Sequence, residues 1–183
     1  TEDSQFKIGE IEFNLKNYKA AIDVFNAFNQ AYPKSNRVAE AHFYMAESYY
    51  YTDDATTAVE HYRKTAELSY DNKLILMAKV SLGWSLLKLK DYPSAEKIYN
   101  EALAFSKEKS ITTDDIYLGQ ASLYTDQQNY QLSREAYENL IREFPESSRV
   151  NEAYLGLGNN YYLLEQYPKA VETYQALITK LSA

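Results

Sequence analysis

The chain has 183 residues, 45% of them hydrophobic and 25% charged, which is enough apolar surface for one domain or one continuous array of repeats. Its net charge of −7 argues against nucleic acid as the main ligand, because no basic stripe is present to neutralise phosphates. The absence of cysteine excludes disulfides and thiolate metal sites, and no apolar run reaches the roughly 20 residues of a membrane span.

Five pairs of helices are predicted along the chain. The sequence has only five glycines and four prolines, and its abundant Ala, Leu, Glu and Lys favour helix over sheet. In chain order the pairs are expected near residues 3–15 with 18–31, 37–51 with 55–69, 74–89 with 92–106, 112–127 with 130–143, and 149–164 with 167–181. We therefore expect an all-α fold of ten helices.

The five pairs share an internal repeat. Each first helix contains a small residue, and subtraction gives intervals of 37, 37, 38 and 37 between these anchor residues: Gly9, Ala46, Gly83, Ala121 and Gly158. Twelve residues after each anchor comes a second small residue: Ala21, Ala58, Ala95, Ser133 and Ala170. Four residues later comes an aromatic: Phe25, Tyr62, Tyr99, Tyr137 and Tyr174. We expect the two small residues to face each other where the helices cross, and the aromatic to fill the space toward the next repeat.

A turn separates the two helices of each pair. It is marked by Asn17, Asp54, Asp91, Asn129 and Gln166, each followed by Tyr or, after Asp54, by Ala. The Asn and Asp side chains among them can cap the second helix. Pro93 and Pro168 fall just inside the second helix, where a missing N–H costs little, and Pro33 and Pro145 follow the second helix and stop it.

This pattern resembles the tetratricopeptide repeat over essentially the whole chain. The match is clearest at residues 81–95 and 154–170, while Ala55 replaces the usual Tyr and Ser133 replaces Ala. The resemblance implies a right-handed superhelical solenoid of five helix–turn–helix repeats that binds other proteins. The array is expected to be single and a fragment of a longer protein, with repeats at approximately 2–36, 37–73, 74–110, 111–148 and 149–183.

Two links between repeats share a longer sequence frame. Residues 32–41 and 144–153 both read aromatic–Pro–x–Ser–x–Arg–Val–x–Glu–Ala. This frame is similar to the long repeats of bacterial cell-envelope proteins, notably the lipoprotein BamD of the outer-membrane assembly machine and the periplasmic coordinator of the Tol–Pal system. The similarity implies a scaffold of envelope assembly that faces the periplasm.

The sequence contains no clear catalytic or metal site. His42 and His61 are the only histidines, and two histidines without a third ligand at metal-binding spacing make a poor metal site. Asp53 and Asp54 form a turn and cap, and the pair Gly156 and Gly158 lies mid-helix, where a phosphate loop does not form. We expect no enzyme activity, cofactor or metal; an enzyme would need a catalytic residue outside the repeat pattern.

A stripe on the first helices is the predicted binding groove. Positions three before, one after and four after each anchor share one helix face, and in arrays of this kind the first helices line the concave side. The predicted groove residues are Phe6, Glu10, Phe13, Phe43, Glu47, Tyr50, Trp84, Leu87, Ser122, Leu155, Asn159 and Tyr162. Val80, Leu87 and Leu118 at the same positions are also candidates for packing between repeats. Because the stripe carries no Lys or Arg, a clamp for a terminal carboxylate is not expected.

The predicted function is a non-enzymatic scaffold that binds a partner segment in this groove, in bacterial cell-envelope assembly or maintenance. Glu10 and Glu47 favour an apolar segment with Lys or Arg at one end. The alternative is a docking domain of a larger cytoplasmic regulatory or assembly protein. The last helix carries an apolar stripe that predicts self-association or a missing capping helix: Val171, Tyr174, Leu177, Ile178 and Leu181.

Overall fold

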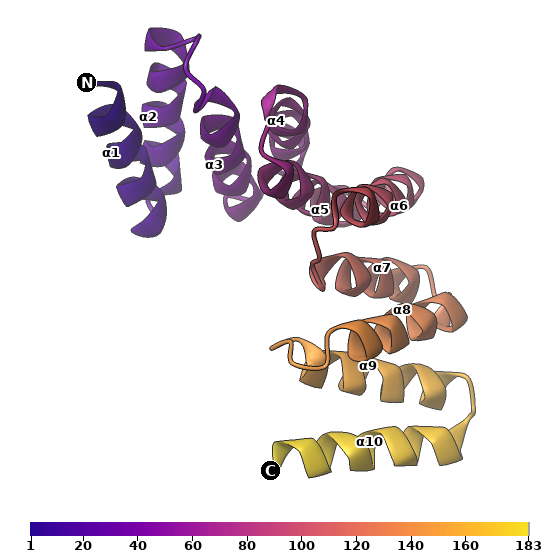
Figure 1. The fold of residues 1–183 in the computed structure, drawn as a ribbon. Coiled ribbons are helices and arrows are strands. Elements are labelled where there is room, and N and C mark those ends of the chain that lie inside the picture. The colour runs from indigo at the N-terminus through magenta and orange to yellow at the C-terminus, as the bar shows by residue number, and fades with distance from the viewer. Residues whose placement is uncertain (183) are drawn as a thin grey trace. The chain divides into compact units, whose positions relative to one another are not determined.

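The computed structural model describes residues 1–182, and this part of the chain is helical without any strand. Figure 1 shows its ten helices. They are α1 (Glu2–Asn14), α2 (Tyr18–Ala31), α3 (Val38–Tyr51), α4 (Ala55–Leu68), α5 (Asn72–Lys88), α6 (Tyr92–Lys109), α7 (Asp115–Asp126), α8 (Tyr130–Glu143), α9 (Val150–Leu163) and α10 (Tyr167–Leu181). The all-α prediction of ten helices is confirmed, and their ends differ from the predicted ones by three residues or fewer. No helix within these residues is both long and apolar enough to cross a bilayer.

The chain divides into two compact units, Thr1–Ile111 and Thr112–Ala183. Unit 1 contains α1 to α6 and therefore the first three repeats, whereas unit 2 contains α7 to α10 and the last two. In each unit every helix packs against the next one in the sequence. In unit 1, α3 also contacts both α1 and α5, so the first helices of neighbouring repeats are direct neighbours.

The anchor glycines make room for the aromatic ring of their own helix pair. A Cβ atom at Gly9 would lie 2.6 Å from the Phe25 ring, and one at Gly83 would lie 2.5 Å from the Tyr99 ring. Gly158 faces Tyr174 in the same way. The predicted contact between the two small residues is observed in the fourth repeat, where the Ser133 hydroxyl donates to the Ala121 carbonyl at 2.9 Å. At the glycine anchors the aromatic ring provides the atoms nearest to the anchor.

The aromatic of the second helix also reaches the following repeat, as predicted, and Phe25 on α2 stacks on Tyr44 on α3 with the ring centroids 5.1 Å apart. The ring of Tyr137 on α8 lies directly against Gly156, two residues before the anchor of α9. The aromatic position thus connects a second helix to the first helix of the next repeat, and Tyr137 is buried between them.

The turns within the five pairs have one backbone conformation in common. The residue before each second-helix cap has a positive φ, and none of these residues is glycine: Lys16, Asp53, Lys90, Gln128 and Glu165. The predicted side-chain cap is confirmed where the oxygen accepts a backbone N–H, at Asp54, Asp91 and Asn129. The prediction is wrong at Asn17, whose side chain makes no cap hydrogen bond and donates to Glu12 instead, and Gln166 makes no cap hydrogen bond either.

The two links of shared sequence fold alike. The N–H of Ser35 donates to the Tyr32 carbonyl and that of Ser147 to the Phe144 carbonyl, both at 3.0 Å. Each serine hydroxyl accepts the N–H of the arginine two residues later, at 3.0 Å for Ser35 and 2.9 Å for Ser147. Each hydroxyl also bonds a carboxylate at the start of its own repeat, Glu2 or Asp114. The shared serine therefore ties the end of a helix pair to its beginning.

Candidate binding surface

The structure buries two of the predicted groove residues. Phe6 is fully buried, with the rings of Phe25 and Phe28 edge-on at 5.1 Å and the Arg37 guanidinium 3.4 Å from its ring centroid. Leu87 is buried as well. The groove prediction is wrong for both residues, because the helix face that carries the stripe is wide enough to include positions that pack between helices. Val80 and Leu118 are buried too, as their packing role requires.

The two predicted groove carboxylates are already hydrogen-bonded. Glu47 accepts the Tyr62 hydroxyl at 2.6 Å and the Ser81 hydroxyl at 3.1 Å, both at the same oxygen. Glu10 pairs with Lys7 at 3.1 Å and accepts the Tyr44 hydroxyl at 3.4 Å. Burial, with the charge of Glu47 as the second cause, raises the pKa of Tyr62, so its hydroxyl stays a donor. Glu47 therefore connects the second and third repeats.

A groove of about 830 Å³ lies along the first helices of unit 1, and we call it the first-helix groove. It is formed by the end of α1, the link before α3, the first half of α3, and the start of α5 with the link before it. Its aromatic and apolar residues are Phe13, Phe43, Tyr44, Tyr70, Leu74 and Met77. Its charged residues are Arg37, Glu40, Asp71 and Lys73.

Two large side chains of this groove are more exposed to solvent than is usual for their type. Tyr70 is completely exposed and Met77 is about half exposed, although both are large and apolar. Tyr44 is half-buried, and burial followed by the charge of Glu10 raises its pKa to about 12, which keeps it a neutral donor. Exposed Tyr and Met beside Phe43 give a surface that loses unfavourable water contacts when a partner covers it.

The charges in the groove are of two kinds. Arg37 lies over the Phe6 ring and pairs with Glu40 at 3.1 Å, so this pair neutralises itself. The ammonium of Lys73 has no ion-pair partner among residues 1–182, and its own backbone N–H is capped by Asp71. Lys73 is thus the groove cation that remains available to a ligand.

The stripe pattern misses most of this groove, although the signal was present. Stepping back by three from Phe43 reaches Glu40 and Arg37, and stepping back by three from Val80 reaches Met77 and Leu74. The groove therefore follows the same helix face one or two turns earlier than predicted. The exposed Tyr70 lies in a link, and no helical period could have placed it.

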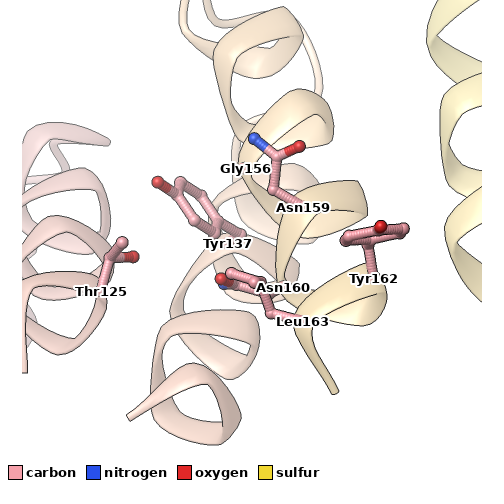
Figure 2. Close-up of a pocket in the computed structure, with 7 residues that line it drawn as sticks. All are labelled: Thr125, Tyr137, Gly156, Asn159, Asn160, Tyr162 and Leu163. Carbon is pink, nitrogen blue, oxygen red and sulfur yellow. The ribbon is translucent and has the colours of Figure 1, made fainter. Parts of the chain in front are cut away.

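Unit 2 has a smaller pocket of about 300 Å³, shown in Figure 2. Its lining comes from α7, α8 and α9 and includes the predicted groove residues Asn159 and Tyr162. Asn159 accepts the Tyr174 hydroxyl at 2.6 Å, and the buried Asn160 donates to the Ser133 hydroxyl at 2.7 Å. Tyr162 is exposed. The pocket is therefore lined by two asparagines and two tyrosines, Tyr137 and Tyr162, and it has no charged side chain, unlike the first-helix groove of unit 1.

The remaining predicted residues lie outside both cavities. Tyr50 is half-buried, and the Lys88 ammonium lies 4.7 Å from its ring centroid. Trp84 is half-buried and contacts Tyr99 edge-on at 6.3 Å. Ser122 is half-buried, whereas Leu155 is exposed. The structure thus brings together Phe13 with Phe43 in unit 1 and Asn159 with Tyr162 in unit 2.

The two histidines meet between α3 and α4. Their Nδ1 atoms are 2.9 Å apart, and Tyr49 stacks on the His61 ring at 5.4 Å. Burial is the main cause that lowers both pKa values to about 4, and His61 and Lys64 add to the effect on His42. Residues 1–182 contain no cluster of three or more side chains suited to a metal. The pair is a neutral hydrogen-bonded contact inside the second repeat.

Comparison with known proteins agrees with the repeat geometry. Family models described as tetratricopeptide repeat match residues 3–35, 37–108 and 118–183. The structure is similar to that of MamA, with a TM-score of 0.79 at 20% identity over 98% of this chain and 91% of that one. MamA residues 41 to the end from Desulfovibrio magneticus RS-1 give 0.79 at 17% identity, over 97% and 93%.

A third similar structure is the Rap conjugation gene regulator of plasmid pLS20 in complex with the Phr* peptide. The TM-score is 0.70 at 18% identity over 96% of this chain, which spans about half, 52%, of that protein. At these identities the structures establish the fold, an all-α solenoid of helical repeats. The family models, which together match most of the chain, show that it belongs to the tetratricopeptide-repeat family.

Proposed function

We propose that this protein is a non-enzymatic scaffold that binds an apolar segment of a partner protein in the first-helix groove. The observation that carries the proposal is the exposure of Tyr70 and Met77 at the edge of a groove walled by Phe13 and Phe43. Aromatic and methionine side chains are enriched in the cores of protein interfaces. A volume of about 830 Å³ is sufficient for several side chains of a bound segment.

The similar Rap structure supports a peptide as the ligand class, because that regulator is complexed with the Phr* peptide. The exposed Asn159 amide of the unit 2 pocket is also suited to a peptide, since its NH2 group can donate to a backbone carbonyl while its oxygen accepts the Tyr174 hydroxyl. We propose that the apolar residues of the segment supply most of its affinity, because buried aromatic contacts dominate interface energies.

The partner segment is proposed to carry Lys or Arg at one end. The net charge of −7, with Glu10 and Glu47 on the first helices, favours a cationic partner. Both carboxylates already accept hydroxyl groups, so their contribution is long-range attraction and faster association more than a direct ion pair. The ammonium of Lys73 in the groove favours a carboxylate elsewhere in the segment.

For the cellular setting we propose bacterial cell-envelope assembly, with the protein in the periplasm or associated with the outer membrane. The support is the resemblance of the links at 32–41 and 144–153 to those of BamD and the Tol–Pal coordinator. The link serine ties each helix pair together, so part of that resemblance reflects folding. A signal peptide or lipobox cysteine in the full-length gene would support the setting, and a plain cytoplasmic start would select the cytoplasmic docking domain.

The groove is tested with peptides selected by display on the wild-type protein. Met77→Glu places a charge in the groove, while Leu89→Glu makes the same change at an exposed leucine of similar exposure that does not line the groove. We expect Met77→Glu to raise the Kd of the selected peptides by about tenfold or more, as for a binding hot spot, and Leu89→Glu to leave that Kd unchanged. Equal affinity of both variants would place the binding surface elsewhere.

A further inference from the structure

The exposed face of α1 carries two isoleucines at positions that are covered in other repeats. Ile8 is 51% exposed and Ile11 is 48% exposed. Ile8 stands one residue before its anchor. The residues at this position in α3, α5 and α9 are exposed by 7% or less: Met45, Leu82 and Leu157. Ile11 stands two residues after its anchor. The residues at this position in the same three helices are exposed by 2% or less: Ser48, Ser85 and Asn160. In those helices the second helix of the preceding repeat packs on this face.

The exposed face of α10 carries aliphatic residues at positions that are more buried in the other second helices. Val171 is 54% exposed and Ile178 is 63% exposed, although both are aliphatic. Twenty residues after the anchor, as at Ile178, the second helices α2, α4 and α8 carry residues that are partly buried: Asn29, Ala66 and Ile141. One position earlier the same helices carry fully buried residues, Phe28, Thr65 and Leu140, whereas Leu177 in α10 is only partly buried.

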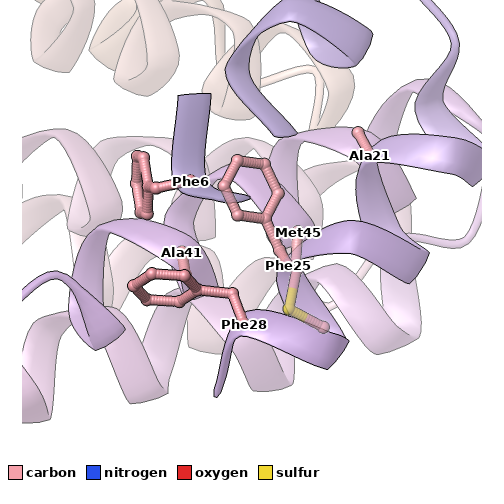
Figure 3. Packing of buried hydrophobic residues seen from close by; sticks show 6 residues of the cluster. All are labelled: Phe6, Ala21, Phe25, Phe28, Ala41 and Met45. Atoms are coloured by element: carbon pink, nitrogen blue, oxygen red, sulfur yellow. The ribbon is translucent and has the colours of Figure 1, made fainter. Parts of the chain in front are cut away.

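Contacts within the chain show which of these positions meet. The Asn29 amide lies 3.8 Å from the Met45 sulfur, so the position of Ile178 meets the position of Ile8. Figure 3 shows the same α2–α3 interface, where Phe28 lies in one cluster with Ala41 and Met45.

A second pair of positions gives the same register. Asn160 donates to Ser133 at 2.7 Å across the α8–α9 interface, so the position of Ala170 meets the position of Ile11. Both pairs that the ends would form, Ile178 with Ile8 and Ala170 with Ile11, are apolar on both sides.

We propose that copies of this protein associate head to tail, with α10 of one copy on α1 of the next, in the register in which α2 packs on α3. The interface continues one that already exists inside the chain, and it covers the aliphatic residues that α1 and α10 leave exposed. Because the two contacting surfaces differ, the association is heterologous and further copies can add.

One residue of α1 must adjust in this register. In the α2–α3 register the ring of Phe25 stacks on Tyr44 with the centroids 5.1 Å apart, so this position accepts a side chain, and the corresponding pair between copies is Tyr174 with Lys7. The Lys7 side chain is 69% exposed, so it can turn its ammonium toward water while its methylene groups cover the ring.

Two double variants block one end each. Ile8→Glu with Ile11→Glu blocks the α1 face, and Val171→Glu with Ile178→Glu blocks the α10 face. All four residues are about half exposed or more, so the helical content of both variants should equal that of the wild type by circular dichroism. Leu89→Glu is the control for an added surface charge, because Leu89 is exposed away from both ends.

Analytical ultracentrifugation of the 183-residue chain measures its mass in solution. We expect the mass of the wild type and of Leu89→Glu to rise with concentration beyond a dimer, and each double variant alone to stay monomeric. An equal mixture of the two double variants should form a dimer and nothing larger. The free α10 face of one variant can bind the free α1 face of the other, and the two remaining faces of that dimer are blocked. A wild type that stays monomeric, or a mixture that stays monomeric, would overturn the proposal. Dimers of the α1-blocked variant alone would indicate symmetric contact between two α10 faces and would also overturn it.

Discussion

Units 1 and 2 use the same repeat pattern but present different surfaces on their first helices. In both units the aromatic of the second helix fills the space at an anchor glycine, as Tyr99 does at Gly83 and Tyr174 at Gly158. Unit 1 has a groove of about 830 Å³ with aromatic walls, while unit 2 has a pocket of about 300 Å³ with amides. The buried positions of the repeat thus determine the helix pairs, and the positions between them are free to define a ligand surface.

The largest expected difference between the two units is in their stability at low pH, because both histidines lie in unit 1. Burial lowers the pKa of His42 and His61 to about 4 from an ordinary value of 6.5, so between these values the unfolded state binds more protons. The stabilisation is complete above about pH 6.5 and is lost as the pH falls toward about 4. After allowance for their coupling, we expect unit 1 to lose on the order of 3 kcal/mol of unfolding free energy.

The single tryptophan makes this prediction measurable. Trp84 lies in unit 1, so its fluorescence reports the unfolding of that unit, while circular dichroism reports both units. The Trp84 transition should move to lower denaturant as the pH falls. In His42→Asn the amide keeps a hydrogen-bonding group near His61 and removes one titrating site, so about half of the pH dependence should disappear. A Trp84 transition that does not move between pH 6.5 and 4 would contradict the histidine assignment.

A larger side chain at the anchor should have unequal effects in the two units. Gly83 faces the fully buried Tyr99, which has no space to move, so Gly83→Leu should destabilise unit 1 by about 1–3 kcal/mol or more. Gly158 faces Tyr174, which is half-buried and hydrogen-bonded to the exposed Asn159. That ring can swing outward, and Gly158→Leu should cost less.

Denaturant unfolding of both leucine variants checks the difference. If Gly158→Leu costs as much as Gly83→Leu, backbone strain at the crossing and not the confinement of the ring sets the cost. If neither substitution changes stability, the crossing is not where the glycines indicate.

The repeat pattern predicted the fold better than it predicted the binding surface. Anchors and aromatics recur in all five repeats because each crossing imposes the same steric demand, so Gly9, Phe25 and their equivalents could be located from spacing alone. The groove depends on which helix positions neighbouring helices cover. Phe6 and Met77 differ in exposure although both belong to first helices, because Phe6 is enclosed by α2 and by Arg37. Tyr70 depends on a link whose path follows no helical period.

The smallest expected difference concerns the caps of α6 and α10. Asp91 and Gln166 precede the same Tyr-Pro pair, and their backbones are alike, with φ −82° and ψ 71° against φ −88° and ψ 56°. The Asp91 side chain accepts the Ser94 N–H at 3.3 Å, whereas the Gln166 side chain makes no cap hydrogen bond. The longer glutamine places its oxygen in a buried position where it accepts no hydrogen bond from residues 1–182.

A reciprocal exchange tests whether the cap residue alone makes this difference. Gln166→Asp should stabilise unit 2 by about 0.5–1 kcal/mol, because the shorter carboxylate can reach the Lys169 N–H and lies at the positive end of α10. Asp91→Gln should destabilise unit 1 by a similar amount. Circular dichroism follows the first change and Trp84 fluorescence follows the second. If Asp91→Gln destabilises but Gln166→Asp gains nothing, the start of α10 frays before the cap can act, and the two units differ in the order of that helix and not only in its capping residue.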